Sequence, residues 1–336
     1  MADDQSSNDT EIISFASSEI SLPRVTRFWM LLLFDVSSTI CALFVLFCVL
    51  INHKLRSTVN NHALIVLLFL GLSLQLIDVP FYLNFIIHSS VTPSNGWICL
   101  LWWLVDIGMY NGGTIILAWI AFERHIIVFY DQLISTRKKR ILIHYLPMLF
   151  LILYSFAYYI YATYYFPCEN IYDYTLPFCN GSPCYLSDPI MGIWNFIINS
   201  ALPSFLEAFF SLSFLFRVFW KKYHSHLPMQ WRKQRKMTIQ LMSLSSLNMA
   251  VTFPIGVIGV AHLCGLPQDV GVQVNQYFFF FSYFVIFLIP FICLASISGV
   301  NRKFQEKILC RRQRQVQRFT ATVKPEHFKS NITMQH

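Results

Sequence analysis

The chain has 336 residues, of which 55% are hydrophobic and 12% are charged, and its net charge at pH 7 is +8. Soluble domains carry roughly one charged residue in four, so this composition excludes an ordinary water-soluble domain. The basic residues lie beside long apolar stretches, where they attract anionic lipid head groups, and we therefore do not expect nucleic-acid binding.

The first segment, residues 1–27, is polar and begins with an acidic stretch. It lacks the basic start and apolar centre of a signal peptide, so we expect a flexible extracellular amino terminus. N-glycosylation sequons begin at Asn8 in this segment and at Asn180 further along the chain, and both are expected on the outer face.

Seven apolar stretches follow, each with about 20 or more residues, which is the length that a helix needs to cross a bilayer. The sequence therefore predicts an all-α fold, an integral membrane bundle of seven transmembrane helices within residues 28–300. The predicted spans cover about residues 28–51, 62–87, 97–122, 142–166, 190–220, 238–263 and 275–298.

The positions of the positive charges predict the orientation of this bundle. Of the 25 Lys and Arg residues, all but Arg24 and Arg27 lie in the carboxyl tail or in and beside the segments that follow spans one, three and five. Cytoplasmic segments carry the excess of Lys and Arg, so these segments are inside and the amino terminus is outside. We expect a multi-pass protein of the plasma membrane.

The third span carries polar residues in a regular register. Arg124 follows Cys99 by 25 residues and Asp106 by 18, which is nearly seven and five whole helical turns. These three residues, with Tyr110 nearby, therefore share one helix face. Ionisable residues inside a membrane are costly and are functional by default. Asp35, Asp78 and Asp106, with no Lys or Arg at their depth, therefore predict a pocket that favours a cationic ligand.

This register resembles that of the rhodopsin-like (class A) G protein-coupled receptors. In that family a Cys at the start of the third helix is followed 25 residues later by the Arg of an acidic–Arg–aromatic triplet, here Glu123, Arg124 and His125. The resemblance implies that Glu123 holds Arg124 in the resting receptor and releases it toward a heterotrimeric G protein on activation. The alternative is that Arg124 only extends to the cytoplasmic membrane surface.

The resemblance also implies a disulfide and a ligand site. Cys99 is expected to bond to the loop after span four, with Cys184 as its partner and Cys179 as the alternative. Asp106 occupies the position at which amine receptors and some peptide receptors hold a ligand ammonium, and Tyr283 matches a tyrosine that hydrogen-bonds this aspartate. Otherwise Asp106 is bonded to Tyr283 and Tyr110 as internal structure. The expected ligand-binding residues are Asp106, Tyr110, Asn195, Asn199, Tyr283 and Asp78.

The later spans resemble the family in their prolines. Pro203, Pro254 and Pro290 in spans five, six and seven match hinges on which the inner half of a helix can swing. Residues 301–310 predict a short amphipathic helix along the inner surface, and Cys310 at its end resembles a palmitoylation site. Residues 311–336 are expected to form a cytoplasmic tail.

Several family residues are replaced in this chain. Gly71 stands where helix two usually carries a sodium-coordinating Asp, and Ser211 replaces a Tyr of helix five. These replacements fall on residues that switch the family's receptors between states. Two motifs of the family are also replaced. In span six the chain has Val251-Thr252-Phe253-Pro254 where the family has Cys-Trp-x-Pro. In span seven it has Ile289-Pro290-Phe291-Ile292-Cys293 where the family has Asn-Pro-x-x-Tyr.

We expect a G protein-coupled receptor that binds an extracellular amine or peptide and contacts a G protein and membrane lipids. The alternative is a membrane transporter or channel, for which no internal repeat is found. A light-sensing rhodopsin needs a Schiff-base lysine where Tyr283 stands. No helical His pair or His–Glu spacing predicts a metal site, so we expect no enzyme activity, metal or cofactor.

Overall fold

The structure is a computed structural model that describes residues 20–56, 59–130, 132, 136–179, 182–224, 231–267 and 270–296. These residues belong to one compact unit that ends at Ser296. They are largely helical and contain no strand, and seven helices are long and apolar enough to cross a membrane, so the prediction of seven spans is confirmed. The predicted amphipathic helix at 301–310, Cys310 and the sequons at Asn8 and Asn180 lie outside the described residues.

Each span is one helix or a series of helices joined end to end. Span one is α2 (Arg24–Ile51), and span two joins α4 (Val59–Ser73), the π-helical turn η1 (Leu74–Asp78) and α5 (Val79–His88). Span three joins α6 (Gly96–Trp103), the π-helical turn η2 (Leu104–Met109) and α7 (Tyr110–Phe129).

Span four joins α8 (Arg137–Arg140), η4 (Ile141–Tyr145), α9 (Leu146–Ile160) and η5 (Tyr161–Tyr165). Span five joins α10 (Pro189–Trp194), η8 (Asn195–Ala201) and α11 (Leu202–His224). Spans six and seven are α12 (Trp231–Leu263) and α13 (Val272–Ser296), and the short helices α3 (His53–Arg56), η6 (Pro177–Cys179) and η7 (Cys184–Leu186) lie between spans.

Proline explains most of the π-helical turns. A proline has no N–H to donate, and its ring crowds the carbonyl four residues earlier, so the helix widens before it. Each of η1, η4, η5 and η8 ends two residues before a proline: Pro80, Pro147, Pro167 and Pro203. No proline follows η2, which therefore has another cause.

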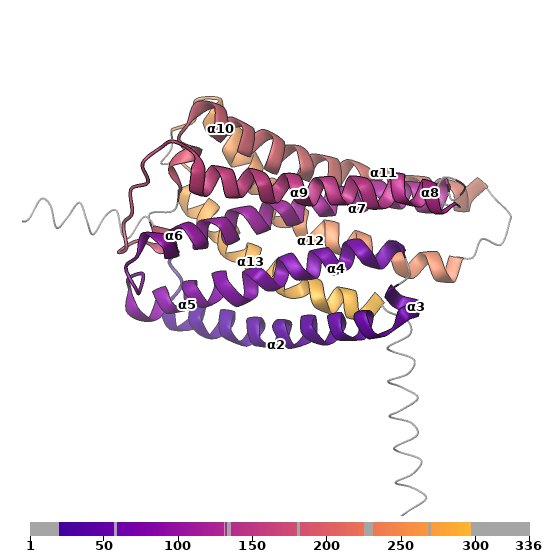
Figure 1. The fold of residues 1–336 in the computed structure, drawn as a ribbon, viewed down its shortest axis with the longest axis horizontal. Coiled ribbons are helices and arrows are strands. Elements are labelled where there is room, and N and C mark those ends of the chain that lie inside the picture. The colour runs from indigo at the N-terminus through magenta and orange to yellow at the C-terminus, as the bar shows by residue number, and fades with distance from the viewer. Residues whose placement is uncertain are drawn as a thin grey trace, which may run out of the picture. The chain divides into compact units, whose positions relative to one another are not determined.

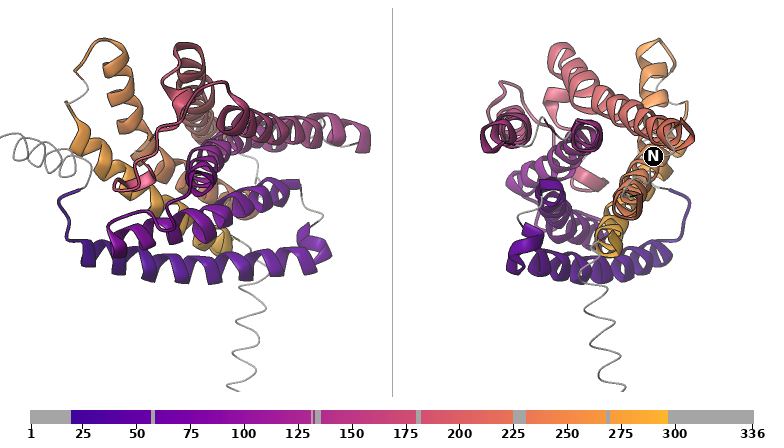
Figure 2. Two further views of the ribbon diagram at one scale, coloured as in Figure 1. Left: turned by 60° about the vertical axis from the view of Figure 1, so that its left-hand side comes forward. Right: turned by 90° about the vertical axis from the view of Figure 1, so that its right-hand side faces the viewer.

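Span three lies at the centre of the bundle. Helix α7 packs against α4, α9 and α11, while α13 packs against α2 and α12 (Figures 1 and 2). In the most apolar stretch of span three 61% of the residues are buried, against 17% in span four. Span three is therefore enclosed by protein, and span four mainly faces the membrane.

The two ends of the bundle differ in composition. The disulfide end, which holds Cys99, Cys168, Cys179 and Cys184, lies beside α5, α6 and α10, and the basic end holds α3 and α8 (Figure 1). A large apolar cluster fills the disulfide end and joins spans one, two, three and seven. Its bulky buried members include Tyr82, Phe85, Trp102, Trp103, Phe178, Phe280, Tyr283 and Phe287.

Three expected boundaries shift. Span three continues to Phe129, so Arg124 lies inside the helix and not at its end. Span four begins at Arg137, about five residues before the prediction. Helix α2 begins at Arg24. Arg27 is only 2% exposed, and its guanidinium donates a hydrogen bond to the Tyr82 hydroxyl at 3.3 Å. Arg27 therefore belongs to the core and not to a polar segment before the span.

Candidate functional site

The loop after span four is fastened by two disulfides. Cys99 is bonded to Cys179, with 5.8 Å between their Cα atoms, and Cys168 is bonded to Cys184. The expected Cys99–Cys184 bond is therefore wrong, and the alternative partner is correct. The backbone N–H of Cys184 donates to the Asn170 side chain at 2.9 Å, which holds Cys184 beside Cys168 and away from Cys99.

Phe178 closes the disulfide end of the bundle. It and Cys179 both adopt left-handed backbone conformations, with φ of 55° and 53°, which turn the loop inward. The Phe178 ring lies 4.8 Å from the ring of Trp102 and 5.4 Å from that of Tyr82, and its carbonyl accepts a hydrogen bond from Trp103 at 2.7 Å. The loop is thereby packed into spans two and three.

Asp78 is fully buried beneath this loop. One oxygen of its carboxyl group accepts hydrogen bonds from the Trp102 indole at 2.6 Å and from the Tyr283 hydroxyl at 3.2 Å. The expectation that Tyr283 bonds Asp106 is therefore wrong. The second oxygen of Asp78 is buried without a hydrogen-bond partner among the described residues.

Asp106 lies within η2 and keeps a partly exposed side chain. In the described ranges it forms no hydrogen bond or ion pair, and neither does the buried hydroxyl of Tyr110 one turn later. Burial, and to a smaller extent the charges of Tyr158 and Asp106, raise the pKa of Tyr185 in the loop. The charge of Asp106 is thus felt by Tyr185 in the loop that covers the disulfide end.

Two other expected ligand residues are bonded to span four. The amide oxygen of Asn195 accepts a hydrogen bond from Tyr159 at 2.8 Å, and that of Asn199 accepts one from Tyr154 at 2.7 Å. The Asn199 amide nitrogen is buried with no partner in the described part of the chain. These asparagines join spans four and five, which limits what they can offer to a ligand.

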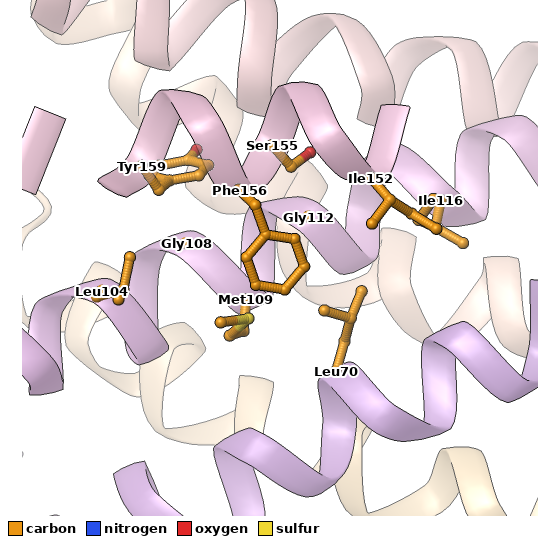
Figure 3. A pocket seen from close by; sticks show the side chains of 10 residues that line it. All are labelled: Leu70, Leu104, Gly108, Met109, Gly112, Ile116, Ile152, Ser155, Phe156 and Tyr159. Atoms are coloured by element: carbon orange, nitrogen blue, oxygen red, sulfur yellow. The ribbon is translucent and has the colours of Figure 1, made fainter. Parts of the chain in front are cut away.

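A small crevice lies between spans two, three and four (Figure 3). Gly108 and Gly112 form one wall, and Ser155, Phe156 and Tyr159 form the facing wall. Its volume of ≈ 20 Å³ accommodates little more than one water molecule. The crevice is therefore too small to be the pocket of an amine or peptide.

The acidic residue of the triplet has a partner in another span. At the basic end the Glu123 carboxyl is hydrogen-bonded to Nδ1 of His144, and Nε2 of His144 lies 3.3 Å from Nδ1 of His62. Glu123 forms no described ion pair with Arg124. The expected hold of Glu123 on Arg124 is thus replaced by a chain of polar groups that links spans three, four and two.

Arg124 is buried at 3% exposure, and one terminal nitrogen of its guanidinium has no hydrogen-bond partner among the described residues. The side chain does not extend to the membrane surface, so that alternative is wrong. His125 points to span five, where its Nε2 donates to the Phe210 carbonyl at 2.7 Å.

Spans five and six are joined by polar contacts in the interior. The Asn248 side chain donates to Glu207 at 2.6 Å, and the hydroxyls of Ser211 and Ser245 lie 2.8 Å apart. Ser211 thus bonds directly to span six. Pro254 and Pro290 lie inside α12 and α13, and Pro203 lies at the start of α11.

No protein-family model matches the chain, and no curated protein matches it significantly. Within the described ranges, no group of three or more His, Cys, Asp or Glu residues is arranged to hold a metal ion.

Sequence reasoning missed three polar residues of the interior. Gln75 donates to Ser38 at 2.8 Å, Arg27 binds Tyr82, and His144 binds Glu123. A signal existed for two of them, since a Gln and a His inside apolar spans are costly unless they are bonded.

Proposed function

We propose that the chain is a G protein-coupled receptor that binds an extracellular ligand, a cationic amine or peptide, and activates a heterotrimeric G protein. One observation carries the proposal. In the central helix, span three, the Asp106 carboxyl group toward the disulfide end and one nitrogen of the buried Arg124 guanidinium toward the basic end have no hydrogen-bond partner among the described residues. One span thus connects the proposed ligand contact with the proposed coupling site.

The ligand contact is proposed at Asp106 because the other carboxyl group of this region is occupied. Asp78 is hydrogen-bonded to Trp102 and Tyr283, so its role in the proposed site is to hold these two side chains in place. The side-chain oxygens of Asp106 and Tyr110 form no hydrogen bond with a described residue. A ligand ammonium at Asp106 would gain a charge-assisted hydrogen bond in a region shielded from bulk water.

Coupling is proposed at the basic end. His144 holds Glu123, which leaves Arg124 without the usual restraint of its neighbour. The polar contacts between Glu207 and Asn248 would resist separation of spans five and six, and Pro254 and Pro290 would supply hinges for it.

The proposal includes a location. The chain lies in the plasma membrane with its amino terminus outside and its carboxyl terminus in the cytoplasm, as the positive-inside rule predicts. Asn8 and Asn180 would then be open to glycosylation and Cys310 to palmitoylation.

G protein activation in cells, measured across panels of amines and peptides, tests the proposal. The active ligand should lose potency by roughly tenfold or more with Asp106→Asn and less with Asp106→Glu, because only the second keeps the charge. Arg124→Ala should abolish signalling at equal surface expression, whereas the control Arg56→Ala, an exposed residue, should signal normally. Normal signalling by Arg124→Ala, or ligand-dependent ion flux that survives this change, would contradict the proposal and favour a channel or transporter.

A further inference from the structure

Span four begins with a cluster of four basic residues. Helix α8 reads Arg137-Lys138-Lys139-Arg140 and lies at the basic end of the bundle (Figure 1). It continues directly into a helix that is mostly exposed to the membrane. Basic clusters next to a membrane span attract anionic lipids.

Part of this cluster borders a hollow with a volume of ≈ 480 Å³. Its lining residues are Arg137, Arg140, Ile141 and Tyr145. Arg137, Ile141 and Tyr145 are spaced four apart and lie along one ridge of the helix. The lining of the hollow is therefore basic along α8 and apolar along η4.

Among the described residues, no acidic side chain neutralises either arginine. Neither forms an ion pair with a described residue, and the Nε of Arg140 is buried without a hydrogen-bond partner. A guanidinium is a planar fork of donors that matches the oxygens of a phosphate. Two such groups at the edge of one hollow form a cradle for a phosphate.

The apolar side continues along the span. Leu142, Leu146, Leu149 and Phe150 are all exposed, by 52% to 65%. Leu149 is nine residues beyond Arg140, which is about 13 Å along a helix. This is close to the thickness of one hydrocarbon leaflet, about half of ~30 Å.

We infer that this hollow binds an anionic phospholipid. Arg137 and Arg140 hold the phosphate of the headgroup, Tyr145 and Ile141 lie at the level of the glycerol, and an acyl chain runs along Leu149. A soluble phosphate would use the arginines alone, and the adjoining apolar ridge is what selects a lipid. The inference holds whether or not the chain signals.

Native mass spectrometry of the purified full chain in detergent micelles tests it. The probes are the dioleoyl forms of phosphatidylcholine, phosphatidylserine and phosphatidylinositol 4,5-bisphosphate. The bisphosphate lipid should be retained most and phosphatidylcholine least. Arg137→Ala with Arg140→Ala should lower retention of the bisphosphate lipid roughly tenfold.

The matched control is Lys138→Ala with Lys139→Ala, which removes the same charge from the same helix but from residues outside the lining of the hollow. It should lower retention less than the arginine pair. Equal losses would mean a diffuse basic surface and would overturn the site. Arg137→Lys with Arg140→Lys, which keeps the charge and the fold, should still reduce retention because the forked donors are lost.

Competition with soluble inositol 1,4,5-trisphosphate separates a lipid from a free phosphate. The soluble headgroup should displace the lipid only weakly because it lacks the acyl chains. Displacement at the same concentration as the lipid itself would reject the lipid as occupant.

Discussion

The carboxyl group of Glu123 in α7 is hydrogen-bonded to the imidazole of His144 in span four and not to Arg124, its neighbour in sequence. Consecutive residues of a helix point about 100° apart, so Glu123 and Arg124 face different parts of the bundle. Glu123 therefore joins two spans, and the buried Arg124 depends on other surroundings.

Replacing His144 by Ala should destabilise the protein because it leaves the buried Glu123 carboxyl without its partner. We expect a loss of about 3 kcal/mol, seen as a lower melting temperature in detergent micelles. Adding Glu123→Gln should recover part of the loss, since the two residues are in contact. The control His53→Ala removes an exposed histidine and should melt like the parent. An unchanged melting temperature in His144→Ala would show that the pair contributes no stability.

Trp102→Phe should cost more stability than Tyr283→Phe. Both side chains donate to Asp78, but the indole bond is 2.6 Å long and the phenol bond 3.2 Å. We expect losses of about 2 and about 1 kcal/mol in thermal unfolding. Trp97→Phe, at a side chain that is 69% exposed, serves as the control. The reverse order would argue against Asp78 as the shared acceptor.

Peptide mapping without reduction should recover two linked pairs, Cys99 with Cys179 and Cys168 with Cys184. A membrane-impermeant maleimide added to the disulfide side should label Cys264, which is exposed and free, and should leave the buried Cys41 unlabelled. Recovery of a Cys99–Cys184 peptide as the main product would refute this pairing.

Gly108→Ala should lower the stability of the protein, whereas Gly112→Ala should raise it. A Cβ on Gly108 would stand 3.1 Å from Cβ and Cγ of Tyr159, which is buried and hydrogen-bonded to Asn195 and cannot move aside. The free energy of unfolding of Gly108→Ala should therefore fall by about 1–3 kcal/mol. A Cβ on Gly112 would meet Ser155 at 3.8 Å, an ordinary contact, and Ala gains up to about 1 kcal/mol over Gly inside a helix. Equal melting temperatures for the two variants would be evidence against the close approach of spans three and four at Gly108.

Hydropathy alone predicts the seven spans because each must satisfy its backbone hydrogen bonds within one long apolar helix. The depth of the spans is harder to predict. Arg124 and Arg27 are charged residues that ordinarily mark the end of a span, yet both are buried in the bundle. The burial of Arg27 involves Tyr82, which lies 55 residues later in the sequence.

The contacts of span three depend on backbone details that a regular helical wheel omits. The wheel assumes 3.6 residues per turn, whereas η2 inserts a wider turn at Asp106 where no proline signals it. In span two, by contrast, Pro80 could have predicted the π-helical turn η1 that carries Asp78. The disulfide pairing depends on two left-handed residues, Phe178 and Cys179, for which no glycine in the sequence gives a signal.

The two disulfides interleave along the chain, and this has a consequence for biosynthesis. The Cys99–Cys179 bond spans 80 residues, and Cys168 lies inside that interval. A chain grows from its amino end, so Cys168 is the first cysteine made after Cys99 and is present before Cys179. Reaching the native pairing then requires exchange of the early bond for the later one. An expression host with little disulfide isomerase should accumulate the Cys99–Cys168 form, in which Phe178 is not held over the bundle.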